Sequence, residues 1–252
     1  ASRGGPGVFG WDIPRAIAAI GRGKKAGGVV IAIAHCGLEY VPYPPPYVVS
    51  AFRAMADAGA DAVVGHHPHV PQGIEWRDGT PIIYSLGNFL FYQHTDLLHR
   101  KTGFCVSLEF DGKRLARIGV HPYRITEQGL RRLDAQQQVS FRKTLAALSK
   151  PFLTAAGPDR AWQAYVAHYG AAGFAAEVSG ILERMKTEPQ KAAAMFRNRL
   201  TTMQHSELWK DHLSATVAGR PAAHPAEATR MVEEYFSRPT VRTVAAPNPP
   251  QP

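Results

Sequence analysis

The sequence has few cysteines, no long apolar run and no long basic run. Cys36 and Cys105 are far apart and form no CxxC pair, which excludes a disulfide-rich scaffold. Two ordinary buried thiols are favoured over one disulfide, and the cytoplasm is the favoured compartment. No stretch approaches the roughly 18 consecutive apolar residues of a membrane span, so no transmembrane segment is expected. The first residues also lack the apolar core of a secretory signal.

Charge is unevenly distributed along the chain, whose net charge is +9. Residues 1–130 contain 13 Lys and Arg against 10 Asp and Glu, or +3, which leaves +6 for residues 131–252. No run of Lys and Arg exceeds two residues. This pattern allows an anionic partner, but it favours a solvated basic face over a specific nucleic-acid site.

The first half alternates β-branched runs with helical stretches. Residues 27–35 form a continuous apolar run bounded by glycines, which predicts a strand buried on both faces. Residues 47–60 have helical spacing and a glycine near their end, and residues 61–65 read as a second short buried strand. Strand, helix and strand in this order predict a βαβ unit with two parallel strands.

The pattern then changes twice along the chain. The Asp111-Gly112 step between two alternating runs predicts an antiparallel hairpin. From about residue 130 the sequence is Ala-rich and helically periodic, which predicts four to six helices packed against the first half. We therefore expect an α/β domain over 1–129, a helical extension over 130–237 and a Pro-rich disordered tail over 238–252.

Three of the eleven histidines lie within four positions, after the second predicted strand. His67 and His69 flank Pro68, where the backbone turns, so both side chains could converge on one ion. The alternative is a polar turn whose imidazoles bond to the backbone. His35 ends the preceding parallel strand, and functional groups collect at such strand ends. We expect the rings of His35, His67 and His69 to approach one another, with His66 beside them.

Two further polar residues are candidates at this edge of the sheet. Asn88 follows a third apolar strand and could either orient a ligand or cap a following helix. Glu39 could be an acceptor for a metal-bound imidazole, a general acid or base, or a surface carboxylate. His94 and His99 are interpreted as surface residues of a loop. Structural or exposed roles are expected for the histidines of the helical half, His168, His205, His212 and His224.

The motifs "HCGLEY", "AGADAVVGHHPHVPQGIE" and "PIIYSLGNFLF", in this order, resemble the capsule-synthesis CapA family. The resemblance runs from about Gly4 to Arg124. It implies a calcineurin-like metallophosphoesterase fold and a link to poly-γ-glutamate capsule production. The expected fold class is therefore α/β: the C-terminal half of an αββα sandwich, followed by an all-helical extension.

The resemblance also implies residue roles. It matches His35, His67 and His69, with His66 beside them, to a site for a divalent metal such as Mn, Zn or Fe. Glu39, His66 and Asn88 are our candidates for catalysis. The family's Gly-Asp strand and Asn-Asn-His element, which supply the other flank of a two-metal site, have no counterpart in this sequence. The chain thus reads as beginning mid-fold, its site incomplete without an N-terminal half. We expect weak catalysis and open strand edges prone to self-association.

Two functions follow as hypotheses. If the chain is an enzyme, the resemblance implies a metal-dependent hydrolase acting on a phosphoester or amide in capsule or poly-γ-glutamate synthesis. The alternative is a non-catalytic assembly or export factor, which binds an anionic polymer through the basic helical half. The expected partner is an anionic small molecule or polymer in either case, and the resemblance also fits association with the cell envelope.

Overall fold

The computed structural model describes residues 9–219 and 223–237. Its first sheet has the strand order β1-β2-β4-β3. β1 pairs with β2 and β2 with β4 in parallel, whereas β3 pairs with β4 antiparallel. This confirms the predicted βαβ unit. The strands are β1 (Ile31–His35), β2 (Ala62–His66), β3 (Ile74–Arg77) and β4 (Thr80–Ile83).

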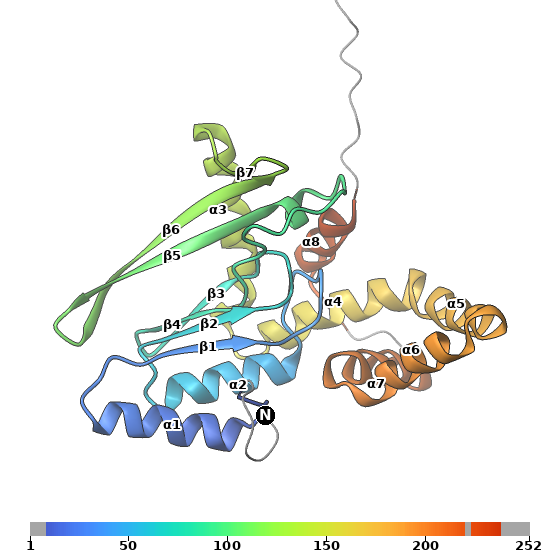
Figure 1. The fold of residues 1–252 in the computed structure, drawn as a ribbon, viewed down its shortest axis with the longest axis horizontal. Helices are drawn as coiled ribbons and strands as arrows, with labels where there is room; N and C mark the ends of the chain where they lie inside the picture. The colour runs from blue at the N-terminus through green and yellow to red at the C-terminus, as the bar shows by residue number, and fades with distance from the viewer. Residues whose placement is uncertain (1–8, 220–222, 238–252) are drawn as a thin grey trace, which may run out of the picture.

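Two helices cover one face of this sheet, α1 (Ile13–Lys25) and α2 (Pro46–Asp57) (Figure 1). Pro46 occupies the first turn of α2, where a missing N–H costs nothing. The apolar residues of α2 pack with Ile20 of α1 and with β2 and β4 in one buried cluster. Asp61 joins α1 to the start of β2, because its carboxylate accepts hydrogen bonds from Lys24 Nζ at 2.8 Å and Val30 N at 2.7 Å.

The prediction that β1 is buried on both faces is wrong. β1 is an edge strand, and Ile31 and Ile33 are 43% and 71% exposed. Only Ala32 and Ala34, which point the other way, pack against the cluster under the sheet. A continuous apolar run does not distinguish a covered sheet face from an uncovered one.

β2 is buried along most of its length, as predicted. A Cβ atom at Gly65 would overlap the carbonyl oxygen of Tyr84 and the ring of Phe52. Glycine therefore lets the end of β2 approach the segment after β4 closely. Val64 and Ile83 pack on the other face of the sheet, together with Phe104 of the second sheet.

The second sheet is an antiparallel meander in the order β5-β6-β7. The hairpin turns at Gly112, whose φ is +60°, which confirms the turn predicted from the Asp-Gly step. Cys105 is exposed and Cys36 half-buried, and both are free thiols, so only the expectation of two unpaired cysteines is met. The strands are β5 (Thr102–Asp111), β6 (Arg114–Thr126) and β7 (Gly129–Arg132), preceded by the 3-10 helix η1 (Leu98–Lys101).

Six α-helices follow within the described residues, as the periodicity predicts. They form a helical C-terminal region, which follows a mixed α/β part with two sheets in the sequence. This arrangement confirms the expected fold class. The predicted tail over 238–252 lies outside the described residues. The helices are α3 (Ala135–Ser149), α4 (Gly157–Ala172), α5 (Phe174–Thr187), α6 (Pro189–Thr201), α7 (Met203–Val217) and α8 (Ala226–Phe236), with the 3-10 helix η2 (Lys150–Leu153) after α3.

The helical region packs against the carboxyl ends of the parallel strands (Figure 1). Its core includes Trp162 of α4 and Val232 of α8, and it also contains Leu38 and Val41 from the segment after β1. The helices therefore share a hydrophobic core with the loops that carry the candidate site. None of the helices in the described part of the chain is long and apolar enough to cross a membrane.

Candidate metal site at the strand ends

Parallel pairing brings the candidate histidines to one edge of the sheet. His35 and His66 are register partners at the ends of β1 and β2. The backbone N–H of Cys36 donates to the carbonyl of His66 at 3.0 Å, so the two strands stay joined to their last residues. His67 and His69 follow at once, which places all four histidines where strands give way to loops.

The loops at this edge have an unusual backbone. His67 (φ +102°), His69 (φ +62°) and Tyr40 (φ +65°) all have positive φ, which side chains with a Cβ rarely adopt. Each such residue costs about 1–3 kcal/mol, and this strain concentrates at functional sites. A hydrogen bond from Tyr40 N to Pro68 O at 2.7 Å holds the two loops together. The backbone thus directs these side chains at a cost in stability.

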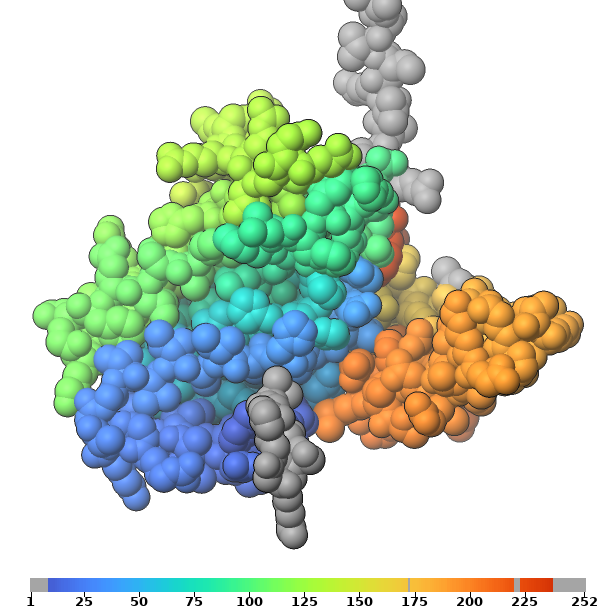
Figure 2. Space-filling model, viewed as in Figure 1, coloured from blue at the N-terminus to red at the C-terminus, as the bar shows by residue number. Residues whose placement is uncertain are grey.

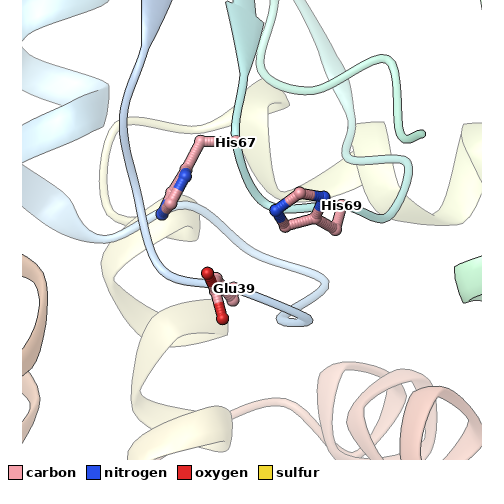
Figure 3. A group of neighbouring side chains, drawn as sticks. All are labelled: Glu39, His67 and His69. Carbon is pink, nitrogen blue, oxygen red and sulfur yellow. The ribbon is translucent and has the colours of Figure 1, made fainter. Parts of the chain in front are cut away.

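Glu39, His67 and His69 form a cluster that could hold a metal ion (Figure 3). One ligand atom from each residue lies within 4.8 Å of the other two. Glu39 comes from the loop after β1, and the two histidines come from the loop after β2. Glu39 is therefore placed as a direct ligand candidate, whereas the sequence suggested a catalytic or supporting role.

His35 extends the cluster on the side of His67. Its Nε2 lies 3.2 Å from Nδ1 of His67, and the two ring centroids are 5.0 Å apart. The rings of His67 and His69 are 5.7 Å apart. The structure thus brings together the three histidines that the sequence predicts to converge.

Asn88 fixes the ring of His69. Its Nδ2 donates to the carbonyl of Arg100 at 3.2 Å, so its Oδ1 is left to accept from Nδ1 of His69 at 2.7 Å. Nε2 of His69 then carries the free lone pair that a metal requires. Asn88 is buried and caps no helix of the described residues, so the helix-cap alternative is wrong; a role in orienting a ligand stays a prediction.

His66 occupies a different position from its neighbours. It is half-buried at the end of β2 and is not part of the cluster formed by Glu39, His67 and His69. Burial, helped by the nearby charge of His35, lowers the pKa of His66. The pKa of His67 is lowered as well, first by burial and then by His35. Both rings are therefore neutral at pH 7.

Several residues around the cluster carry no sequence signal of their own. Arg100 stacks on Tyr40, with its Cζ 3.8 Å from the ring centroid, and the ring of Tyr40 lies 5.7 Å from that of His69. Phe91 also packs against His69, at a ring distance of 5.7 Å. These contacts link distant segments, so only the folded chain reveals them.

A cavity of about 440 Å³ opens beside the cluster. His35 and His67 line it together with Trp11, whose ring packs edge-on against Tyr47 at 5.9 Å. Cys36 also lines it, and burial raises the pKa of this thiol to about 12, which rules out a thiolate nucleophile at neutral pH. The site therefore consists of histidines and a carboxylate beside an open cavity.

Among the remaining histidines, the prediction for His99 is wrong, and the position of His205 near the site was not predicted. His94 is exposed as predicted, but His99 is buried, stacks on Tyr235 at 3.9 Å and bonds to Glu234. It joins the segment before β5 to α8, a contact 135 residues away in sequence. His205 lies near the site, close enough for the charges of Glu39 and His67 to act on its pKa. The sequence gave no reason to separate His205 from the other histidines of the helical half.

Residues 6–93 match a family described as bacterial capsule synthesis protein PGA_cap. This segment of the chain is similar to the PGA_cap family. Among its relatives is the "PGA biosynthesis protein CapA" of Bacillus subtilis, 46% identical over 93 residues, or 37% of this chain and 24% of that protein. The "Capsule biosynthesis protein CapA" of Bacillus anthracis is 46% identical over 70 residues, or 28% of this chain and 17% of that protein.

The PGA_cap segment contains every residue of the predicted site, from His35 to Asn88. It ends at residue 93, short of the limit at Arg124 predicted from the motifs. The chain aligns with about a quarter or less of the length of these curated relatives. The helical region, including His205, lies outside the segment that matches the family.

Proposed function

We propose that this chain carries a metal-dependent hydrolase site that cleaves a phosphoester or an amide during synthesis of a capsule polymer such as poly-γ-glutamate. The observation that carries the proposal is the convergence of Glu39, His67 and His69 from two strand-end loops. The backbone strain at both histidines and the buried amide behind His69 support it.

The residues fit a divalent ion in number and type, and one pair of nitrogens has the spacing of two ligands. Imidazole and carboxylate ligands suit Zn, Mn and Fe. Around a tetrahedral ion with bonds of about 2.0–2.1 Å, neighbouring ligand atoms lie about 3.3–3.4 Å apart. The 3.2 Å between Nε2 of His35 and Nδ1 of His67 is close to that value. The pair can therefore be either a hydrogen bond in the free protein or two ligands of one ion.

The residues would divide the work as follows. Glu39, His67 and His69 would hold the ion, with His35 beside His67 as a candidate fourth ligand. Asn88 would keep His69 in its binding orientation. The chemistry that a divalent ion supplies at such a site is Lewis acidity and a bound water of lowered pKa. His66 is neutral at pH 7, so it could accept a proton from the attacking water.

Hydrolysis assays test the proposal. We expect slow turnover of p-nitrophenyl phosphate or of γ-glutamyl p-nitroanilide when Mn²⁺ or Zn²⁺ is added. The His67→Ala variant should lose it, because removing one of three ligands leaves no closed coordination set. The matched control is His121→Ala, which removes an exposed imidazole of β6 that contacts Ser107. Turnover that needs no metal, or that survives in His67→Ala, would contradict the proposal.

The basic helical half favours a second candidate function. Residues 131–252 carry a net charge of +6, which suits an assembly or export factor that holds an anionic polymer. Binding of poly-γ-glutamate should then fall steeply as salt rises and should not depend on metal. Polymer binding that persists in His67→Ala, together with no hydrolysis in the wild type, would favour this function over the enzyme.

A further inference from the structure

The cavity beside the histidines has walls from two parts of the chain. His35, His67, Trp11 and Tyr47 belong to the N-terminal part, whereas Met203 and Gln204 belong to the start of α7. In Figure 2 the orange helices α5–α7 lie beside the blue N-terminal segments. The family match ends at residue 93, so the wall formed by α7 comes from outside the PGA_cap segment.

Two pKa effects agree with this placement of the start of α7. Burial and Arg199 lower the pKa of His205, the next residue after Gln204, and the charges of Glu39 and His67 also contribute. Burial raises the pKa of Tyr47, which also lines the cavity, and the carboxylate of Glu207 in α7 adds a small contribution. The first turn of α7 therefore faces the loops after β1 and the start of α2.

A buried network holds α7 in this position. Trp209 of α7 donates from Nε1 to the hydroxyl of Tyr169 at 2.8 Å, and that hydroxyl donates to the carboxylate of Glu177. Arg199 of α6 donates to the same carboxylate from Nε at 2.7 Å. Four helices thus meet at one carboxylate, so the wall is a fixed part of the fold.

The chemistry of the lining indicates what the cavity accepts. Among the described residues that line it, none is Asp, Glu, Lys or Arg. Trp11, Tyr47 and Met203 offer apolar and aromatic surface, and Gln204 offers an amide that can donate and accept at once. Away from an ion held at the histidines, an anionic group would meet no cation of the lining, whereas an uncharged amide finds both a donor and an acceptor in Gln204.

We propose that the start of α7 is the substrate-selecting wall of the histidine site. Met203 and Gln204 bind an uncharged, amide-bearing part of the substrate, next to the group that sits at the histidines. The inference rests on the proposed metal site and deepens it: it assigns substrate selection to α7, and it favours the amide over the phosphoester.

Metal-chelating probes test the inference by binding alone. Acetohydroxamate reports on the ion, N-acetylglycine hydroxamate adds one uncharged amide, and succinate monohydroxamate adds a carboxylate instead. Isothermal titration into the Zn²⁺-loaded 252-residue chain should show the amide probe binding about tenfold more tightly than acetohydroxamate, the gain from one hydrogen bond plus contact area. The carboxylate probe should show no gain.

Variants of α7 separate the wall from the ion. Gln204→Ala and Met203→Ala should lose the advantage of the amide probe while binding Zn²⁺ and acetohydroxamate as the wild type does. Leu213→Ala, an exposed position farther along the same helix, should keep it. Equal affinity of the wild type for all three probes, or a larger gain for the carboxylate probe, would contradict the proposal that the start of α7 selects the substrate. Failure of the wild type to bind Zn²⁺ would instead overturn the metal site, and the inference with it.

Discussion

At the scale of single residues, Asn88 connects three segments through one buried side chain and its backbone. Its side-chain amide accepts a hydrogen bond from His69 and donates one to the carbonyl of Arg100. Its backbone carbonyl accepts from the hydroxyl of Tyr123 at 2.9 Å. The orientation of His69 therefore depends on β6 and on the segment before β5. Outer-shell partners of this kind tune metal affinity without touching the ion.

Replacing Asn88 should weaken metal binding. Asn88→Ala removes the acceptor that fixes His69, and we expect the Kd for Zn²⁺ to rise about 10- to 100-fold, as measured by isothermal titration. Asn88→Asp keeps an acceptor and should restore much of the affinity. Asn198→Ala on α6 is the matched control. If Asn88→Ala bound Zn²⁺ as tightly as the wild type, Asn88 would have a purely structural role.

The individual site residues were predictable to different degrees. His67 and His69 follow from their crowding around Pro68, and His35 follows from its place at a strand end. The ligand position of Glu39 did not follow, because it depends on the loop that turns at Gly37 (φ +112°). A loop conformation of this kind is set by contacts between segments, which sequence spacing does not encode.

At the scale of helices and strands, Glu177 ties the helical region together. Burial alone would raise the pKa of Glu177, but hydrogen bonds from Tyr169 and Arg199 outweigh it, so the pKa is lowered. A carboxylate with a lowered pKa stabilises the fold at pH values above its unfolded pKa of about 4.3. This contribution is lost as the pH falls through the folded pKa.

Glu177→Gln should destabilise the chain by about 1–3 kcal/mol at pH 7, because hydrogen bonds to a charged group are lost. Urea unfolding measures this free energy. As the pH falls below about 4.3 and through the lowered folded pKa of Glu177, the wild type should lose this advantage, so the two unfolding curves should converge. Glu183→Gln, which removes an exposed carboxylate of the same helix, is the control. A difference between Glu177→Gln and wild type that did not shrink as the pH was lowered through the acid range would contradict this account.

Helices, strands and turns were easier to predict than the burial and the contacts of their residues. The βαβ unit, the Asp-Gly hairpin and the helices after residue 130 all follow from local periodicity and turn residues. The exposure of Ile31 and Ile33 did not follow, because the sequence of β1 does not say whether anything covers its outer face. The burial of His99 against Tyr235 likewise depends on a helix far along the chain.

At the scale of the whole molecule, the chain places a family-matched α/β segment against a helical region. The site residues lie in the first, and one wall of the adjoining cavity comes from the second. The periodicity predicts these helices but not which helix faces the strand ends, because packing geometry is a property of the assembled fold. The boundary expected at residue 129 falls at the start of β7, and the division into domains stays a prediction.

Anomalous diffraction from crystals grown with Zn²⁺ tests the central claim most directly. We predict a single strong peak about 2.0–2.2 Å from an imidazole nitrogen of His67, an imidazole nitrogen of His69 and a carboxylate oxygen of Glu39. The peak should vanish in crystals of His67→Ala and remain in crystals of His121→Ala. A map with no peak at these three residues, at a Zn²⁺ concentration that loads other proteins of this ligand type, would contradict the account.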